Sequence, residues 1–215
     1  MHEIPIAAVS ETATDTPLHD TTFKLTDIEK INKIEYHFAK IMHTLGLNLY
    51  DDSLSGTPKR VAKMFVKEMF SGLNPDNKPE ISLFENRYNY KKMLIEKDIT
   101  LYSTCEHHFV PIIGKVHVAY IPAKHVIGLS KINRLAEYYA KRPQVQERLT
   151  VQILEALKEV LQHHDVAVVI EADHLCVASR GIKDTNSKTV TASYSGQFED
   201  NAVRQEFLSQ IQNNK

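Results

Sequence analysis

Apolar residues recur every three or four positions in the first third of the chain, which is the spacing of one helical face. The first such run covers residues 28–45. Thr26 and Glu29 form a capping box in front of it, so we predict an amphipathic helix there. A second helix is predicted to start at Thr57-Pro58, because threonine followed by proline is a common helix start.

Further along the chain the period changes, and segments rich in Val, Ile, Thr and Tyr predict β-strands. The predicted strands are residues 93–103, 110–121, 165–173 and 188–198. Helices are predicted to start at Ser130 and after Pro143, and a last helix covers Asn201–Gln212. Gly114 predicts a bulge or a close backbone approach inside the second strand. Residues 74–92, rich in Pro, Asn and charge, are interpreted as a connection.

Paired strands alternating with paired helices favour an α+β domain in which helices cover one face of an antiparallel sheet. We divide the chain into a disordered tail (1–22), an N-terminal helical region (23–92) and a sheet-containing domain (93–215). Such a sheet leaves unpaired edges, and closure into a ring of subunits would cover them.

The composition is that of an ordinary globular protein, with 215 residues of which 42% are hydrophobic and 25% charged. A net charge of -1 without a dense Lys/Arg tract argues against a nucleic-acid or membrane surface. The first 22 residues have neither a basic leader nor an apolar core, so we expect no signal peptide and no anchor. Two cysteines give no disulfide framework, which favours the cytoplasm and thiols that are free to bind metal.

Cys105 and His108 stand in a C-x-x-H spacing, which lets a tight turn bring a thiolate and an imidazole onto one metal ion. The other cysteine, Cys176, lies far along the chain. Together the three would form the Cys2His set of a catalytic zinc site, which leaves a fourth position for water, whereas a structural site would need four ligands. The spacing alone supports equally well an alternative without metal, in which the cysteines are small buried apolar residues and the histidine is solvated.

Titratable residues flank these candidate ligands. The reference pKa of a histidine side chain lies near neutrality, so His107 and His174 are candidates for proton transfer, although a structural role explains each as well. Glu147 either complements the dipole of a predicted helix or accepts hydrogen bonds from adjacent N–H groups of a ligand. Basic residues near the metal motifs could bind a polyphosphate, although surface cations usually do not. They are Arg60, Lys131, Arg134 and Arg180.

Several motifs, in this order, resemble GTP cyclohydrolase I over about residues 26–212. They are Thr57-Pro58-Lys59-Arg60-Val61-Ala62, Phe70-Ser71-Gly72-Leu73, Cys105-Glu106-His107-His108, Gly114-Lys115-Val116, Tyr120-Ile121-Pro122, Ile127-Gly128-Leu129-Ser130-Lys131-Ile132-Asn133-Arg134, Arg142-Pro143-Gln144-Val145-Gln146-Glu147-Arg148-Leu149-Thr150 and Arg180-Gly181-Ile182. Several motifs in order are far more specific than one C-x-x-H. The resemblance therefore favours the zinc interpretation.

The resemblance implies an activity: conversion of GTP and water into 7,8-dihydroneopterin triphosphate and formate, the first step of folate and pterin biosynthesis. By residue matching, Cys105, His108 and Cys176 would bind Zn²⁺ and thereby activate a water for attack on the purine. The matched positions of His107 and His174 are those of proton transfer.

The resemblance also implies how the substrate is bound. Glu147, with Gln146 beside it, would accept from the guanine N–H edge, and Ser130 would act in the later sugar rearrangement. Arg60, Lys131, Arg134 and Arg180 would face the triphosphate. The implied architecture is the tunnelling fold, a pentameric ring commonly stacked into a homodecamer, with active sites between subunits.

Three rival interpretations remain. A nucleoside deaminase would carry H-x-E and P-C-x-x-C, and this chain has no C-x-x-C. A pterin synthase of the same fold would bind zinc through three histidines, against which the pair Cys105 and Cys176 argues. A scaffold with structural zinc would need a fourth protein ligand, for which Glu106 is the candidate.

Overall fold

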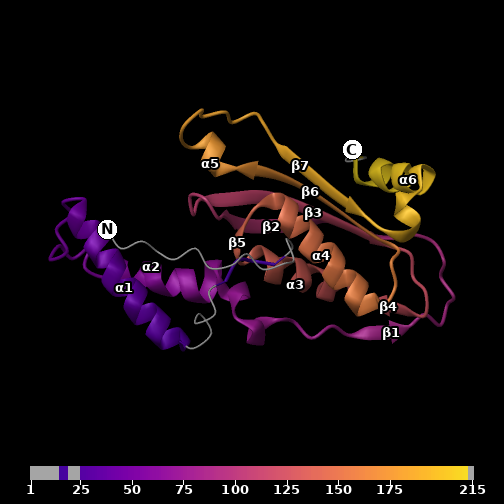
Figure 1. The fold of residues 1–215 in the computed structure, drawn as a ribbon, viewed down its shortest axis with the longest axis horizontal. Coiled ribbons are helices and arrows are strands. Elements are labelled where there is room, and N and C mark those ends of the chain that lie inside the picture. Colours follow the sequence, from indigo (N-terminus) through magenta and orange to yellow (C-terminus); the bar gives the residue numbers. More distant parts are fainter. Residues whose placement is uncertain (1–14, 19–24, 213–215) are drawn as a thin grey trace.

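The computed structural model describes residues 15–18 and 25–212 (Figure 1). Its α-helices are α1 (Asp27–Thr44), α2 (Thr57–Met64), α3 (Leu129–Ala140), α4 (Gln146–Leu161), α5 (Leu175–Ala178) and α6 (Asn201–Gln212). Its strands are β1 (Leu83–Glu85), β2 (Leu94–Cys105), β3 (Pro111–Tyr120), β4 (His125–Ile127), β5 (Pro143–Gln144), β6 (Val166–His174) and β7 (Thr189–Tyr194). A π-helical turn covers Phe65–Met69, and 3₁₀ turns cover Ser71–Leu73, Pro75–Asn77 and Gly196–Glu199. Among these residues no helix combines the length and apolar character needed to cross a bilayer.

Five strands form one sheet in the order β5-β2-β3-β6-β7, antiparallel except for the short pair β2 and β5. The four predicted strands are confirmed, but β7 stops at Tyr194 and is followed by a 3₁₀ turn. The register pairs Ile112 of β3 with both Ser103 of β2 and His174 of β6. The end of β2, the start of β3 and the end of β6 therefore meet at one end of the sheet, which we call the Cys105 end.

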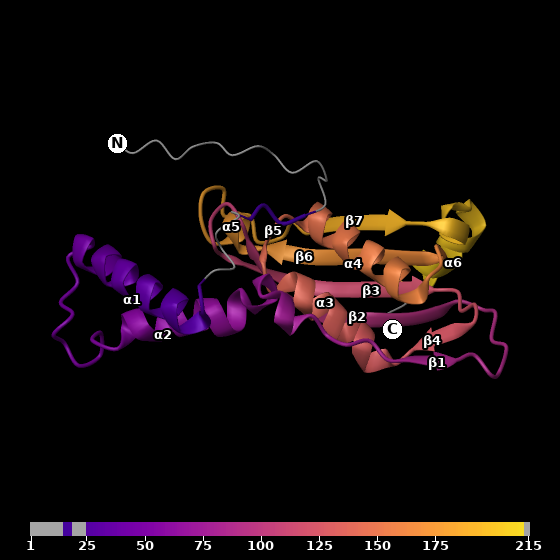
Figure 2. The same cartoon turned by 60° about the horizontal axis from the view of Figure 1, so that its bottom comes forward.

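Helices α3 and α4 pack on one face of the sheet (Figure 2). Because strand side chains alternate between faces, Val116 and Val118 of β3 point to these helices and join the main core. Leu135 of α3 and Leu157 of α4 meet them there, each 1% exposed. This arrangement confirms the predicted α+β class with an antiparallel sheet under helices.

Helix α6 covers part of the opposite face, which the prediction of helices on one face did not include. Phe207 and Ile211 of α6 pack with Phe198 against Ala167 and Val169 of β6. The last helix thus packs on the side chains of β6 that point away from α3 and α4.

Gly114 of β3 lies against the backbone of β6. A Cβ at this position would come within 2.1 Å of the carbonyl oxygen of Glu171 and 2.6 Å of the Cα of Ala172. The predicted close backbone approach is therefore confirmed. The sheet's irregularity lies in β2 instead, where the register shifts between Glu96 and Ile99.

Helices α1 and α2 form an N-terminal extension next to the Cys105 end of the sheet (Figure 1). The capping box is confirmed, because the Thr26 N–H donates to Glu29 Oε2 at 2.7 Å and the Glu29 N–H donates to Thr26 Oγ1 at 3.3 Å. The second helix is also confirmed, although it passes into the π-helical turn after Met64. The predicted tail, residues 1–22, lies outside the described residues except for 15–18.

Residues 74–92 were predicted as a connection, and this prediction is wrong at β1. This strand pairs antiparallel with β4, with Leu83 opposite Ile127 and Glu85 opposite His125. The two-stranded ribbon leads into α3. Three residues are too few to show a strand period, and the partner strand lies far along the chain, so the local pattern does not reveal the pairing.

Candidate metal centre

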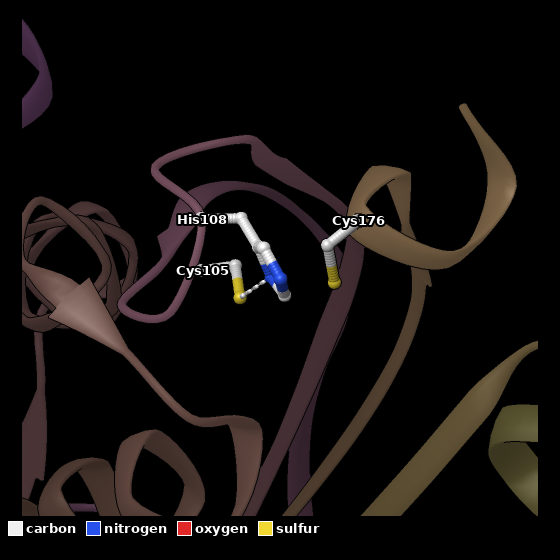
Figure 3. Close-up of side chains that lie close together, drawn as sticks. All are labelled: Cys105, His108 and Cys176. Atoms are coloured by element: carbon white, nitrogen blue, oxygen red, sulfur yellow. Dashed lines mark hydrogen bonds between the residues drawn. The ribbon is translucent and has the colours of Figure 1, made fainter. Parts of the chain in front are cut away.

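Residues 105–109 form a tight loop between β2 and β3, which we call the 105–109 loop. The Cys105 N–H donates to the Val110 carbonyl and the Phe109 N–H to the Cys105 carbonyl, both at 2.9 Å. Phe109 adopts the left-handed conformation, with φ of +53°. This closure brings Cys105 Sγ to 3.9 Å from His108 Nδ1, as the C-x-x-H spacing predicts (Figure 3).

Cys176 reaches the same place from α5, which follows β6 directly. Pairing of His174 with Ile112 holds the end of β6 beside the start of β3. One ligand atom from each of Cys105, His108 and Cys176 lies within 4.8 Å of the others. Figure 3 shows the three side chains converging. Among residues 15–18 and 25–212 this is the one cluster of at least three such donors, and it consists of the three predicted ligands.

Two thiols and an imidazole are donors that zinc and related metals prefer. Both cysteines are free. Burial and a hydrogen bond with the Cys105 thiol raise the pKa of the Cys176 thiol, so a metal must displace its proton to bind. The donor set therefore fits a transition metal and leaves a four-coordinate ion one protein ligand short.

Two of the predicted polar residues lie at the rim of the cluster. His107 is exposed, and its Nδ1 lies 3.8 Å from Cys105 Sγ. Arg180 Nη1 donates to His108 Nε2 at 3.0 Å. Arg180 therefore lies beside the candidate ligands, as its position four residues after Cys176 suggested.

Gln146 points into the protein and is 1% exposed. Its amide nitrogen donates to the carbonyl oxygens of Ile170 and Thr189 and to Thr191 Oγ1, at 3.1, 3.0 and 3.1 Å. These three acceptors orient the amide, so its Oε1 faces His174 Nε2 at 2.7 Å. Neutral His174 therefore carries its proton on Nε2 and presents Nδ1 as an acceptor.

Glu147 is exposed in the first turn of α4, beside His174. Burial lowers the pKa of His174, and the Glu147 and Asp173 carboxylates oppose that shift. The turn lies at the Cys105 end because Gln144 of β5 pairs with Cys105 of β2. The structure thus brings Glu147 and His174 to the metal cluster from separate predicted elements.

Arg148 is a residue of the site that the sequence reasoning did not single out. Both of its terminal nitrogens donate to Glu106 Oε2, at 2.8 and 2.7 Å, and the two side chains are 11% and 24% exposed. Glu106, the candidate fourth ligand of a structural site, is thus held by an arginine. The sequence signal for this ion pair was weak: an acidic residue, Glu106, in one of the matched motifs and a basic residue, Arg148, in another.

Three predicted residues on α3 are not brought to the cluster within this chain: Ser130, Lys131 and Arg134. Ser103 Oγ donates to the Ala140 carbonyl at 2.8 Å, which places the end of α3 at the Cys105 end. Ser130 precedes Ala140 by 10 residues, about 15 Å along a helix axis. Helix α3 begins next to β4, near the opposite end of the sheet (Figure 2).

Arg60 of α2 makes its side-chain hydrogen bonds within the N-terminal extension. Its Nη2 donates to the Ser53 carbonyl at 3.1 Å and to Thr57 Oγ1 at 2.8 Å. The guanidinium therefore closes the loop in front of its own helix. The structure of one chain gives Arg60 no contact with Cys105, His108 or Cys176.

The fold and the site together define a class of protein. Strand ends and a short helix bring two thiols and an imidazole into one cluster. His107 lies next to Cys105, and the Glu147 carboxylate is close enough to His174, two residues before Cys176, to oppose the lowering of its pKa by burial. Metal donors with titratable neighbours in a polar setting are typical of metal-dependent enzymes.

Comparison with known proteins identifies the family. The profile of the GTP cyclohydrolase I family matches residues 34–212. The chain is 60% identical over 195 residues to GTP cyclohydrolase 1 of Flavobacterium johnsoniae, covering 91% of this chain and 87% of that protein. It is 56% identical over 179 residues to the GTP cyclohydrolase 1 proteins of Pasteurella multocida and Mannheimia succiniciproducens, covering 83% of this chain and 82% of each of them. The chain belongs to the GTP cyclohydrolase I family of enzymes, so the resemblance and the tunnelling-fold class are confirmed.

Proposed function

We propose that this chain hydrolyses and rearranges GTP to 7,8-dihydroneopterin triphosphate and formate, with Zn²⁺ as cofactor, as the first step of folate and pterin biosynthesis. Family membership supports GTP as the substrate. The observation that carries the proposal is the convergence of Cys105, His108 and Cys176 donors within 4.8 Å, with His107 and His174 beside them. Loss of purine C8 as formate requires water and proton carriers at one place, and this cluster provides for both.

Zinc suits the three donors and the reaction. When bound, zinc supplies a water molecule whose pKa is lowered toward neutrality. A closed structural site is disfavoured, because Glu106 is hydrogen-bonded to Arg148 and no other fourth donor joins the cluster among the described residues. The site needs reduced thiols, which the cytoplasm maintains.

His174 is suited to accept a proton at Nδ1. Its Nε2 lies 2.7 Å from Gln146 Oε1 and donates a hydrogen bond to it, which fixes the tautomer with the proton on Nε2. Burial lowers the pKa of His174, so the imidazole is neutral and ready to accept at neutral pH. His107, which is exposed beside Cys105, is the second proton carrier in this proposal.

Glu147 is suited to recognise guanine. A carboxylate accepts two parallel hydrogen bonds, and the adjacent N1–H and N2–H of guanine form a matching donor pair. The Glu147 side chain is exposed in the first turn of α4, at the same end of the sheet as Cys105. The Gln146 carboxamide is used inside the fold, so Gln146 supports the guanine edge by fixing the start of α4 and the ring of His174.

A second copy of the chain is needed to complete the proposed site. Ser130 lies about 15 Å along α3 from the Cys105 end, which is too far to act at the cluster of its own chain. We propose that Ser130, Lys131 and Arg134 of one copy face the cluster of a neighbour in a pentameric ring, two of which form a decamer. Arg180 contributes from the metal side, and Arg60 joins the triphosphate site by leaving its loop contacts.

The experiment is incubation of zinc-loaded protein with GTP, following formate release and the appearance of a pterin, with a chelated sample as control. Formate and pterin in equal amounts, lost on chelation, support the whole proposal. Formate without pterin would show ring opening without rearrangement and would exclude the proposed role of Ser130. Neither product from a zinc-replete assembly would overturn the proposal and favour a scaffold.

A further inference from the structure

The 105–109 loop ends in a residue that is unusual for its conformation. The Phe109 N–H donates to the Cys105 carbonyl at 2.9 Å, a five-residue closure whose last residue is left-handed. Glycine normally occupies that position, because a Cβ is strained at positive φ. Phenylalanine therefore needs a compensating contact to hold the loop in this form.

That contact comes from the N-terminal extension. The ring of Phe109 lies 5.1 Å from the ring of Phe70 and 6.3 Å from that of Phe65, measured between centroids, at interplanar angles of 57° and 87°. Phe65 and Phe70 are themselves 5.4 Å apart. Tilted and edge-on pairs at these distances are favourable. We call the three residues the aromatic clamp.

The π-helical turn gives the clamp its shape. The Phe70 N–H donates to the Phe65 carbonyl at 2.9 Å, spanning five residues instead of four. In a regular α-helix, residues five apart point about 140° away from each other. The wider turn brings Phe65 and Phe70 together on the side that faces the loop. Such turns occur often at functional sites.

We propose that the aromatic clamp is a positioning device for His108, through which the N-terminal extension sets the metal affinity of the site. Phe109 follows His108 directly, so the rings that fix its backbone also fix where the imidazole of His108 points. None of the three rings is a metal ligand. The inference rests on the zinc site of the proposed function.

A purely structural role makes a different prediction. If the rings only attach the extension to the domain, their loss lowers stability and leaves the affinity for metal unchanged. If the left-handed backbone alone shapes the loop, Phe109→Gly binds metal at least as well as the parent, since glycine adopts that conformation without strain. Positioning by the clamp predicts weaker metal binding both when a ring of the extension is removed and in Phe109→Gly.

The test is zinc affinity by competition with a chelator, together with the absorption spectrum of the Co²⁺ form, for Phe70→Ala, Phe109→Gly and the double variant. We expect each single variant to bind zinc about tenfold more weakly, as for other residues that orient ligands. The double variant should bind zinc no more weakly than the single variant with the lower zinc affinity, because both changes break the same contact. Tyr50→Ala is the matched control, since Tyr50 lies in the same extension with its side chain 99% exposed.

Parent affinity in single variants that keep the parent circular dichroism would overturn the inference, as would losses that add in the double variant. Phe70→Leu, which keeps apolar volume and lacks a ring, should give an intermediate affinity and provides the comparison if Phe70→Ala does not fold. A parent protein that binds no zinc would instead overturn the proposed function. The two failures are therefore distinguishable.

Discussion

Both terminal nitrogens of Arg148 donate to one carboxylate oxygen of Glu106, at 2.8 and 2.7 Å. Glu106 stands between Cys105 and His107, whereas Arg148 follows Glu147 in the first turn of α4. The ion pair therefore ties the loop with two proposed zinc ligands to the helix with the proposed guanine acceptor. Its side chains are 11% and 24% exposed, so leaving one partner unpaired is costly.

Arg148→Gln should weaken zinc binding about tenfold, because the 105–109 loop loses its attachment to α4. The free energy of unfolding of the metal-free protein should fall by about 1–3 kcal/mol, since Glu106 is left unpaired. Urea unfolding and chelator competition measure the two effects. The double variant Glu106→Gln/Arg148→Gln should recover part of the stability. The single variant Glu106→Gln completes the comparison, and a double variant whose loss of stability equals the sum of the losses in Arg148→Gln and Glu106→Gln would contradict the pairing.

Glu147→Gln should keep its zinc and lose turnover of GTP. An amide presents an N–H where guanine also presents one, so the paired hydrogen bonds are lost. With about 3 kcal/mol for two charge-assisted bonds, kcat/KM should fall about 100-fold. Glu155→Gln, further along α4 and exposed, is the matched control. Equal kcat/KM for parent and Glu147→Gln would remove Glu147 from the guanine site.

Mixed assemblies test whether neighbouring copies share a site. We expect Cys176→Ala chains, and chains with Ser130, Lys131 and Arg134 all replaced by alanine, to be inactive alone. In an equal mixture of the two, about a quarter of the interfaces combine an intact cluster with an intact α3, so about a quarter of the parent activity should return. Activity that stays absent in verified mixed rings would place the whole site within one chain.

The sequence predicts those features that depend on local pattern. The capping box of Thr26 and Glu29 is local, and so are the strand segments that end at Cys105 and begin after the loop. The metal donors could also be predicted from the sequence, because the C-x-x-H spacing indicates two of them and Cys176 is the only other cysteine. These features need no knowledge of the tertiary fold.

Other features depend on partners that sequence spacing does not reveal. β1 exists through its pairing with β4, and the inward orientation of Gln146 depends on acceptors in β6 and β7. The link from Arg148 to Glu106 joins two motifs across 42 positions. Ser130 lies at the far end of α3 from the cluster of its own chain, and its role at the cluster of a neighbouring copy stays a prediction that rests on the resemblance.

His117 makes stability depend on pH. It is 7% exposed, its Nδ1 accepts from the Asp98 N–H at 3.2 Å, and burial lowers its pKa despite the Asp98 carboxylate nearby. Below about pH 6.5 His117 is protonated in the unfolded chain but stays neutral in the folded protein. The free energy of unfolding therefore decreases by up to about 1.4 kcal/mol for each unit by which the pH is lowered. Above that pH both states are neutral and the effect is absent.

His117→Gln should flatten this dependence by one proton, because glutamine can accept a hydrogen bond and does not titrate. Urea unfolding at pH 7.5 and 5.5, at a fixed chain concentration, measures the difference. His37→Gln, on the exposed surface of α1, is the control and should behave like the parent. The same pH dependence in parent and His117→Gln would contradict the assignment.

The most direct test of the central claim is to titrate zinc into metal-free protein while measuring bound zinc and formate released from GTP in the same sample. The cluster of Cys105, His108 and Cys176 predicts that activity rises with bound zinc and stops rising at about one zinc per chain. Cys176→Ser should lose zinc and activity together. Full turnover without zinc, or full activity in Cys176→Ser, would contradict the account.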